Sequence, residues 1–173
     1  MLIMVEIKGQ LCNMCGAKKL ILREDEIEVP YFGRVFIFSM SCEACGYRKS
    51  DLEPVEKKES CSFTLEVSSE DDLNIKIVKS GDATLKIPRI ISIEPGPVSN
   101  GYISNVEGVI EKVKKVIQSA AEAEDDKDIA KKAKKQIKKL NNVLLGRDTI
   151  KLIISDPSGN SAIISDKAQK SKL

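Results

Sequence analysis

The chain has 173 residues, and 28 Lys and Arg against 26 Asp and Glu leave a formal net charge of +2. This balance argues against a dedicated nucleic-acid-binding protein, which usually carries a clear basic excess. The absence of His excludes Ser-His-Asp and Cys-His catalysis and His-ligated metals. No apolar stretch approaches the ~18 residues of a membrane span, and the N-terminus lacks a secretory signal, so we expect a soluble, cytoplasmic protein.

Two Cys-x-x-Cys-Gly motifs stand near the start of the chain, at Cys12–Gly16 and Cys42–Gly46. Two such pairs of thiolates are the ligand set of a tetrahedral structural zinc ion, and the Gly after each second Cys accepts the positive φ of a tight turn. The alternative is a redox-active Cys-x-x-Cys pair. We predict one structural Zn²⁺ bound by Cys12, Cys15, Cys42 and Cys45. Cys61, within an alternating segment, is predicted to be a buried strand cysteine.

The segment between the motifs predicts a zinc ribbon over residues 8–52. A β-like stretch at 19–29 and a β-branched, aromatic stretch at 34–40 are joined by a turn signal at Pro30–Gly33. Tyr31 and Phe32 then lie at the hairpin tip, far from the metal. An exposed aromatic pair is a candidate anchor for a partner, and the alternative is that the pair packs onto the following domain.

A β domain is predicted over residues 56–165, after a polar linker at 51–60. Short β-like segments with turn signals between them indicate a sandwich, barrel or β-helix. These segments are 61–67, 74–79, 84–87, 90–94, 149–155 and 161–165. The motif Asp156-Pro157-Ser158-Gly159-Asn160 is typical of a turn rather than of a catalytic site. The polar tail at 166–173 is predicted to be flexible.

An antiparallel helical hairpin is predicted as an insertion at residues 104–146. Ser104 and Glu107 have the spacing of a capping box, and apolar residues follow at helical intervals. A second helix is predicted from about residue 127 to 145, with Gly146 at its C-terminal end. The spacing of apolar residues therefore changes from that of a strand to that of a helix and back again. This indicates that the helical hairpin is inserted within the β domain.

The second predicted helix is rich in lysine. Seven Lys residues lie within it, at 127, 131, 132, 134, 135, 138 and 139. This Lys127–Lys139 face is a candidate nucleic-acid patch, but the solvated face of an amphipathic helix has the same composition. Interleaved aromatics and Arg, which would favour base stacking, are missing, and the acidic run at 122–126 dilutes the positive field.

The motifs in their order resemble those of the ZPR-type zinc-finger proteins, in the archaeal form with a single module. The motifs that carry the resemblance are Cys12–Gly16, Val29–Phe32, Ser41–Tyr47, Asp71–Asn74, Ile77–Ser80, Ile87-Pro88, Gly101, Ser104–Gly108 and Asp156–Ser161. The resemblance covers roughly residues 10–165. It implies a mainly β, α+β chain in which a zinc ribbon precedes a double-stranded β-helix domain with an inserted helical hairpin.

The resemblance also implies a function. Eukaryotic members bind translation elongation factor 1-alpha and help it to fold, so we expect a non-enzymatic, zinc-stabilised protein-binding module that acts as an adaptor or chaperone. The candidate partner-binding residues are Tyr31, Phe32, Asp72, Asn74, Lys79 and Ser80. The chain departs from the family pattern in three places: Ile75 replaces a usual Arg, Arg89 replaces a usual acidic residue, and Ser104 and Asn105 replace a usual pair of Thr.

Two other functions compete with this expectation. The first alternative is a zinc-ribbon RNA- or DNA-binding factor of the translation or transcription machinery. The second, an enzyme in a cupin-like barrel, is disfavoured because such sites depend on His ligands and the chain has none.

Overall fold

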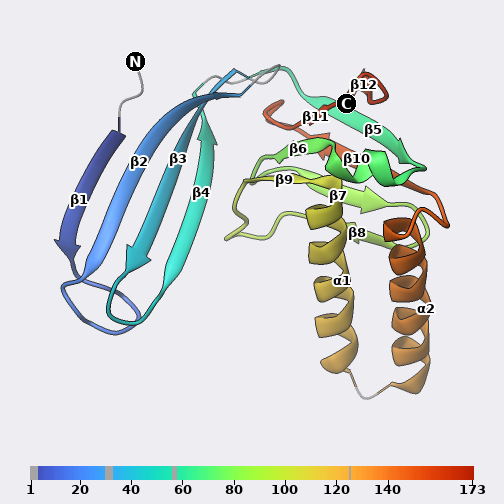
Figure 1. Ribbon diagram of the computed structural model, residues 1–173, viewed down its shortest axis with the longest axis horizontal. Coiled ribbons are helices and arrows are strands. Elements are labelled where there is room, and N and C mark those ends of the chain that lie inside the picture. Colours follow the sequence, from blue (N-terminus) through green and yellow to red (C-terminus); the bar gives the residue numbers. More distant parts are fainter. Residues whose placement is uncertain (1–3, 30–32, 56–57, 125) are drawn as a thin grey trace.

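The computed structural model describes residues 4–29, 33–55, 58–124 and 126–173. Figure 1 shows a curved N-terminal sheet beside a second β unit from which two helices project. The N-terminal sheet is antiparallel in the order β1-β2-β3-β4. Its strands are β1 (Met4–Gln10), β2 (Leu20–Val29), β3 (Gly33–Cys42) and β4 (Arg48–Pro54). β2 and β3 pair without a shift from Leu20↔Cys42 to Val29↔Gly33, which brings the two Cys motifs to one end of the sheet.

This sheet is larger than the predicted ribbon at residues 8–52. β1 begins at Met4 and was not predicted as a strand, and β4 continues to Pro54 inside the predicted linker at 51–60. The linker prediction was wrong over residues 51–54 because β4 pairs along β3, with Asp51 opposite Phe38. Cross-strand pairing of this kind overrides the low strand propensity of a polar segment.

The second β unit consists of two sheets, ordered β12-β5-β10-β7-β8 and β11-β6-β9. Its elements are β5 (Cys61–Val67), the 3₁₀ helix η1 (Glu70–Asn74), β6 (Lys76–Lys79), β7 (Thr84–Ile87), β8 (Ile91–Ile93), β9 (Tyr102–Asn105), β10 (Ile150–Asp156), β11 (Ala162–Ile164) and β12 (Gln169–Lys172). Two packed antiparallel sheets of this kind form a jelly roll. The predicted double-stranded β-helix-like domain is therefore confirmed.

Two helices, α1 (Val106–Glu122) and α2 (Lys127–Leu144), lie between β9 and β10 in the chain. The inserted helical pair is confirmed, and in Figure 1 it extends away from the sheets as a separate arm. Its apolar face joins the main core through eight buried residues, five on α1 (Val106, Val109, Ile110, Val113 and Ile117) and three on α2 (Ala133, Leu140 and Val143). Val116 and Ile129, which the predicted stripes include, are instead 43% and 36% exposed. No helix in the described part of the chain is long and apolar enough to cross a membrane.

The helix ends are set by local hydrogen bonds. The predicted cap at Ser104 was one residue too early, because Ser104 pairs with Ile77 in the sheet and Asn105 caps α1 instead. The Asn105 side chain accepts a bond of 2.8 Å from the Gly108 amide. At the end of α2 the Gly146 amide donates to the Val143 carbonyl at 3.0 Å, one of the paired bonds of a Schellman motif. Gly146 therefore has its predicted place.

The C-terminal segment at 166–173 is ordered, so the prediction of a flexible tail was wrong. β12 pairs antiparallel with the edge of β5, from Gln169↔Thr64 to Lys172↔Cys61. The Lys167 ammonium also lies 2.6 Å from the Asp72 carboxylate. All side chains of β12 are exposed, and the segment is held by backbone pairing, by the ion pairs of Lys167 and of Lys172 (with Glu59, 3.2 Å) and by Ala168, which packs against the main core. None of these leaves a hydrophobic pattern in the sequence.

The ribbon packs against the jelly roll through a small apolar cluster. Val35 of β3 is fully buried beside Val78 and Ala162, with Ile27 and Phe63 packed around them. The Gly101 amide donates to the Asp51 side chain at 3.3 Å, which links β4 to the loop before β9. The two units therefore meet at the end of the ribbon opposite the cysteines.

The connection between the units is fitted closely to the Asp156–Asn160 turn. The Lys58 amide faces the Ser158 carbonyl at 3.4 Å. Gly159 has a φ of +71°, and a Cβ at this position would overlap the Glu59 carbonyl group. Only Gly combines this backbone conformation with so close an approach.

Candidate metal centre

The two Cys-x-x-Cys-Gly motifs form loops of the same geometry. The Gly16 amide donates to the Cys12 carbonyl at 2.8 Å, and the Gly46 amide donates to the Cys42 carbonyl at 2.9 Å. Gly16 and Gly46 both have a φ of +72°. The predicted positive φ is thus present in both loops, and it lets each loop reverse the chain directly after its second cysteine.

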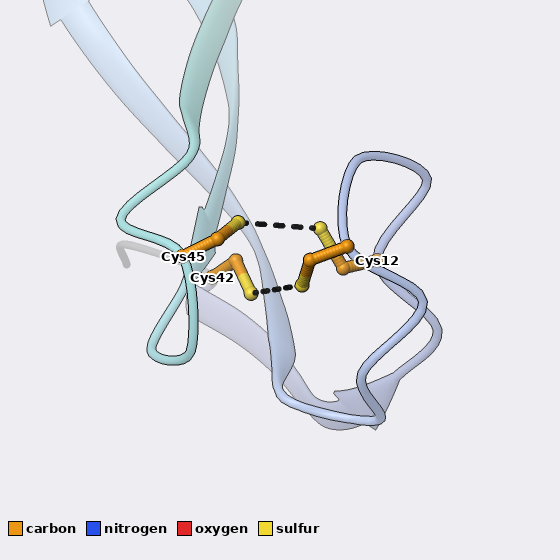
Figure 2. A group of neighbouring side chains, drawn as sticks. Cys12, Cys42 and Cys45 are labelled. Atoms are coloured by element: carbon orange, nitrogen blue, oxygen red, sulfur yellow. Dashed lines mark hydrogen bonds between the residues drawn. The ribbon is translucent and has the colours of Figure 1, made fainter.

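The four thiols of Cys12, Cys15, Cys42 and Cys45 form one compact group. Their sulfur atoms all lie within 4.8 Å of one another. The Cys12 and Cys45 sulfurs are 3.8 Å apart, and the Cys15 and Cys42 sulfurs are 3.7 Å apart. A tetrahedral zinc ion with Zn–S bonds of ~2.3 Å requires sulfurs about 3.8 Å apart, so the group fits the metal. Figure 2 shows Cys12, Cys42 and Cys45 converging from the two loops.

The surroundings of the cysteines favour bound thiolates. Cys12 and Cys42 are buried and pack with Leu20, Leu22 and Met40 of β2 and β3. The backbone amide of Cys45 points at the Cys42 sulfur and, with the amide of Ala44, lowers the pKa of Cys42 to about 7. The Tyr47 amide lowers the pKa of Cys45, but burial and the neighbouring thiols outweigh it and raise that pKa to about 12, so a bound cation is needed to hold all four groups as thiolates. Four thiolates would fill the coordination sphere of zinc, so such a site supports the fold and offers no open position to a substrate.

Cys61 lies outside this group, as predicted. It is 2% exposed in β5, and its thiol faces the Ser161 carbonyl at 3.9 Å. Burial raises the pKa of the Cys61 thiol, which disfavours a reactive thiolate.

Three of the candidate partner-binding residues are buried. Asp72, Lys79 and Ser80 are 1%, 5% and 3% exposed, so their side chains lie inside the jelly roll and not on its surface. Asp72 accepts bonds from the Ser68 and Ser69 amides at 3.0 and 3.1 Å, besides its ion pair with Lys167. Asn74, at the end of η1, is exposed. Tyr31 and Phe32 lie outside the described residues.

Asp156 is the centre of a buried polar network that the sequence did not reveal. One carboxylate oxygen accepts from the Ser80 hydroxyl at 2.8 Å and from the Ser161 hydroxyl at 2.5 Å. The other accepts from the Ser158 amide at 2.8 Å and the Ser158 hydroxyl at 2.6 Å. Burial alone would raise the pKa of Asp156, but these hydrogen bonds outweigh it and lower the pKa. The network fastens the Asp156–Asn160 turn to the end of β6, which is a structural role.

The lysines of the Lys127–Lys139 face are exposed along α2, while Ala133, Leu140 and Val143 are its buried residues. The helix is thus amphipathic, as the pattern predicts.

Comparisons with known proteins match both units. The model of the ZPR1 zinc-finger domain matches residues 5–59, and the model of the ZPR1 jelly-roll domain matches residues 71–173. An uncharacterized ZPR1-like protein of Methanocaldococcus jannaschii is 38% identical over 167 residues, which cover 94% of this chain and 83% of the relative. Another uncharacterized ZPR1-like protein, from Pyrococcus horikoshii, is 36% identical over 173 residues, which cover 97% of this chain and 78% of that relative.

Eukaryotic relatives match over a smaller part of their own length. The zinc finger chaperone zpr1 of Schizosaccharomyces pombe is 30% identical over 158 residues, which cover 88% of this chain and 33% of that protein. Human zinc finger protein ZPR1 is 29% identical over 160 residues, which cover 88% of this chain and 34% of the human protein. The chain therefore corresponds to about a third of each eukaryotic relative.

Proposed function

The chain belongs to the ZPR1 family, and on that premise we propose that it is a non-enzymatic protein-binding module that assists the folding of translation elongation factor 1-alpha. The observation that carries the proposal is the match of almost the whole chain to a relative named as a zinc finger chaperone. The elongation-factor partner follows from the resemblance of the sequence motifs to the eukaryotic family members.

The metal centre supports a role as a binding platform. A closed set of four thiolates stabilises the two loops without providing a Lewis acid to a substrate. In Figure 1 the cysteine end of the ribbon and the free end of the helical pair extend to the same side of the molecule. Two arms of this kind offer a larger protein more contact than either unit alone.

We place the partner surface on exposed side chains. Burial of Asp72, Lys79 and Ser80 leaves Asn74 as the exposed member of the jelly-roll candidates. Tyr31 and Phe32 are retained as proposed aromatic anchors, since large amphipathic side chains often dominate the energy of a protein interface.

Titration calorimetry tests the proposal. The zinc-loaded protein is titrated into elongation factor 1-alpha from the same source, first free of nucleotide and then with GDP or GTP. We expect micromolar or tighter binding that depends on the nucleotide state. A Tyr31→Ala/Phe32→Ala variant should bind more weakly at an unchanged melting temperature. Absence of binding in all three states would refute the proposed partner.

A nucleic-acid-binding role is the second candidate, and the exposed lysines of α2 favour it. Contacts to several phosphates weaken by orders of magnitude as salt rises, whereas a packed protein interface weakens far less. Binding of an RNA oligonucleotide with a steep salt dependence, together with no binding to the elongation factor, would support this candidate.

A further inference from the structure

A groove lies between the β7–β8 turn and one face of α2. It consists of two adjoining hollows of about 300 and 260 Å³, which share Arg89, Ile90, Lys132 and Gln136 in their walls. The Gln136 amide donates to the Ile90 carbonyl at 2.5 Å and so holds the turn against the helix. The groove therefore has two walls fixed to each other and is distant in sequence from the cysteines.

The side chains around this groove carry an unbalanced positive charge. Five cationic residues line it, namely Lys86, Arg89, Lys132, Lys135 and Lys139, and none of the described lining residues is acidic. Only Lys139 has an ion pair, at 4.0 Å from Asp148; the other four have none within the described ranges. Because the whole chain has a net charge of only +2, this is a strong local concentration.

The cations on α2 form a row. Lys132, Lys135 and Lys139 are spaced at i, i+3 and i+7, so they share one face and span about 10 Å along the helix. A single phosphate or carboxylate is too short to contact all of them. The spacing fits an extended ligand with several negative groups.

Arg89 adopts an unfavourable backbone conformation at the mouth of the groove. Its φ is 65°, and it is the one non-glycine residue in the described part of the chain with a positive φ. This conformation costs on the order of 1–2 kcal/mol for a residue other than Gly or Asn. A long cationic side chain at a position suited to Gly indicates that the guanidinium itself is needed there.

The floor of the groove is apolar. Ile87 is 1% exposed, and Ile90 and Ile91 are partly buried against the main core. Among the described residues no aromatic side chain lines either hollow, so these walls offer the bases of a nucleic acid no ring to stack on. A ligand that uses both the floor and the rim must carry apolar and acidic groups together.

We propose that this groove binds an acidic peptide segment of a partner protein, with an apolar side chain on Ile90 and Ile91 and carboxylates against Arg89, Lys132 and Lys135. Arg89 suits this role because a guanidinium binds a carboxylate through two parallel hydrogen bonds. The inference does not depend on the identity of the partner, so failure of the elongation factor to bind would leave it unaffected.

Fluorescence anisotropy with a labelled peptide, Ser-Glu-Leu-Glu-Asp-Leu-Glu-Ser, tests the inference on the full zinc-loaded chain. We expect saturable binding that weakens as salt rises from about 50 to about 300 mM. Peptides with Gln and Asn in place of the acids, or Gly in place of Leu, should bind at least about tenfold more weakly. Equal binding of all three peptides would overturn the proposal.

Variants locate the binding. Arg89→Gly relieves the backbone strain, so it should keep or raise the melting temperature. The same variant should bind the peptide about tenfold more weakly, because it loses the guanidinium. Lys132→Ala/Lys135→Ala should have a similar effect on binding. Lys131→Ala/Lys138→Ala, which removes the same charge from exposed positions of α2 outside the groove, should change affinity by less than about twofold.

Competition separates the proposed ligand from other anions. If millimolar inorganic phosphate displaces the peptide completely, the groove is a general anion site and the proposal fails. It also fails if an oligouridylate binds more tightly than the peptide and loses affinity in the same variants, since the groove would then serve a nucleic acid.

Discussion

At the scale of single residues, buried carboxylates hold together parts of the jelly roll that are distant in sequence. Asp156 reaches back 76 positions to the hydroxyl of Ser80, and Asp72 reaches forward 95 positions to the ammonium of Lys167. Each carboxylate is surrounded by donors, which offsets the cost of removing its charge from water. The stability of the jelly roll should therefore depend on these residues staying ionised.

The acid stability of the protein tests this account of Asp72. Burial would raise its pKa, but the Lys167 ion pair and the serine amides outweigh this and lower the pKa from 3.8 to about 2. In acid the unfolded state therefore takes up the proton first. The stabilisation, about 2 kcal/mol, is present above pH ~4 and is lost between about pH 4 and 2.

Urea unfolding of the native protein and of Asp72→Asn measures this contribution. The two should differ most in the free energy of unfolding at about pH 5 and should converge as the pH approaches about 2. Asp71→Asn, at the exposed neighbouring position, is the matched control and should follow the native protein throughout. If the difference in free energy of unfolding between the native protein and Asp72→Asn did not change with pH, the lowered pKa of Asp72 would be contradicted.

At the scale of elements, the metal loops were predictable because their chemistry is local. A Cys-x-x-Cys-Gly motif places both ligands and the turn within a few residues, and pairing of β2 with β3 then brings the second motif beside the first. The helical pair was predictable for the same reason, since its 3.6-residue period is visible in the sequence.

Elements fixed by distant contacts were predicted poorly. β12 has an entirely exposed, polar sequence, and only its pairing with β5 makes it a strand. The start of α1 moved to Asn105 because β6 holds Ser104 in the sheet. Asp72, Lys79 and Ser80 are polar residues within or beside a predicted strand, and no local pattern shows that the fold buries their side chains.

Removal of zinc tests the role of the metal loops. Metal analysis should find about one Zn²⁺ per chain, and a strong chelator should unfold β1 to β4, because a structural site of this type contributes about 10–16 kcal/mol of apparent binding free energy. Amide NMR spectra report which residues lose their fold. We expect the signals of the ribbon to collapse while those of α1 and α2 persist.

Two cysteine variants separate the metal site from general effects of mutation. Cys42→Ser should lose the metal, whereas Cys61→Ser should retain one equivalent because Cys61 lies outside the four-thiol group. Less than half an equivalent of zinc in native protein purified without chelator, or unchanged spectra after chelation, would rule out a structural zinc site.

At the scale of the whole molecule, the zinc end of the ribbon is left free because the ribbon attaches by its other end. Val35 packs into the jelly roll near the start of β3, and Gly159 lets the connection at Glu59 lie directly against the Asp156–Asn160 turn. The metal loops and the helical pair therefore both extend away from the junction between the two units (Figure 1). This arrangement is the structural basis of the proposed chaperone function.

The most direct test of that function is refolding of elongation factor 1-alpha from urea with and without the zinc-loaded protein, followed by recovered binding of a fluorescent GTP analogue. We predict that recovery rises with added protein until the two are equimolar, and that zinc-stripped protein gives no increase. Equal recovery with and without the zinc-loaded protein would contradict the proposed function.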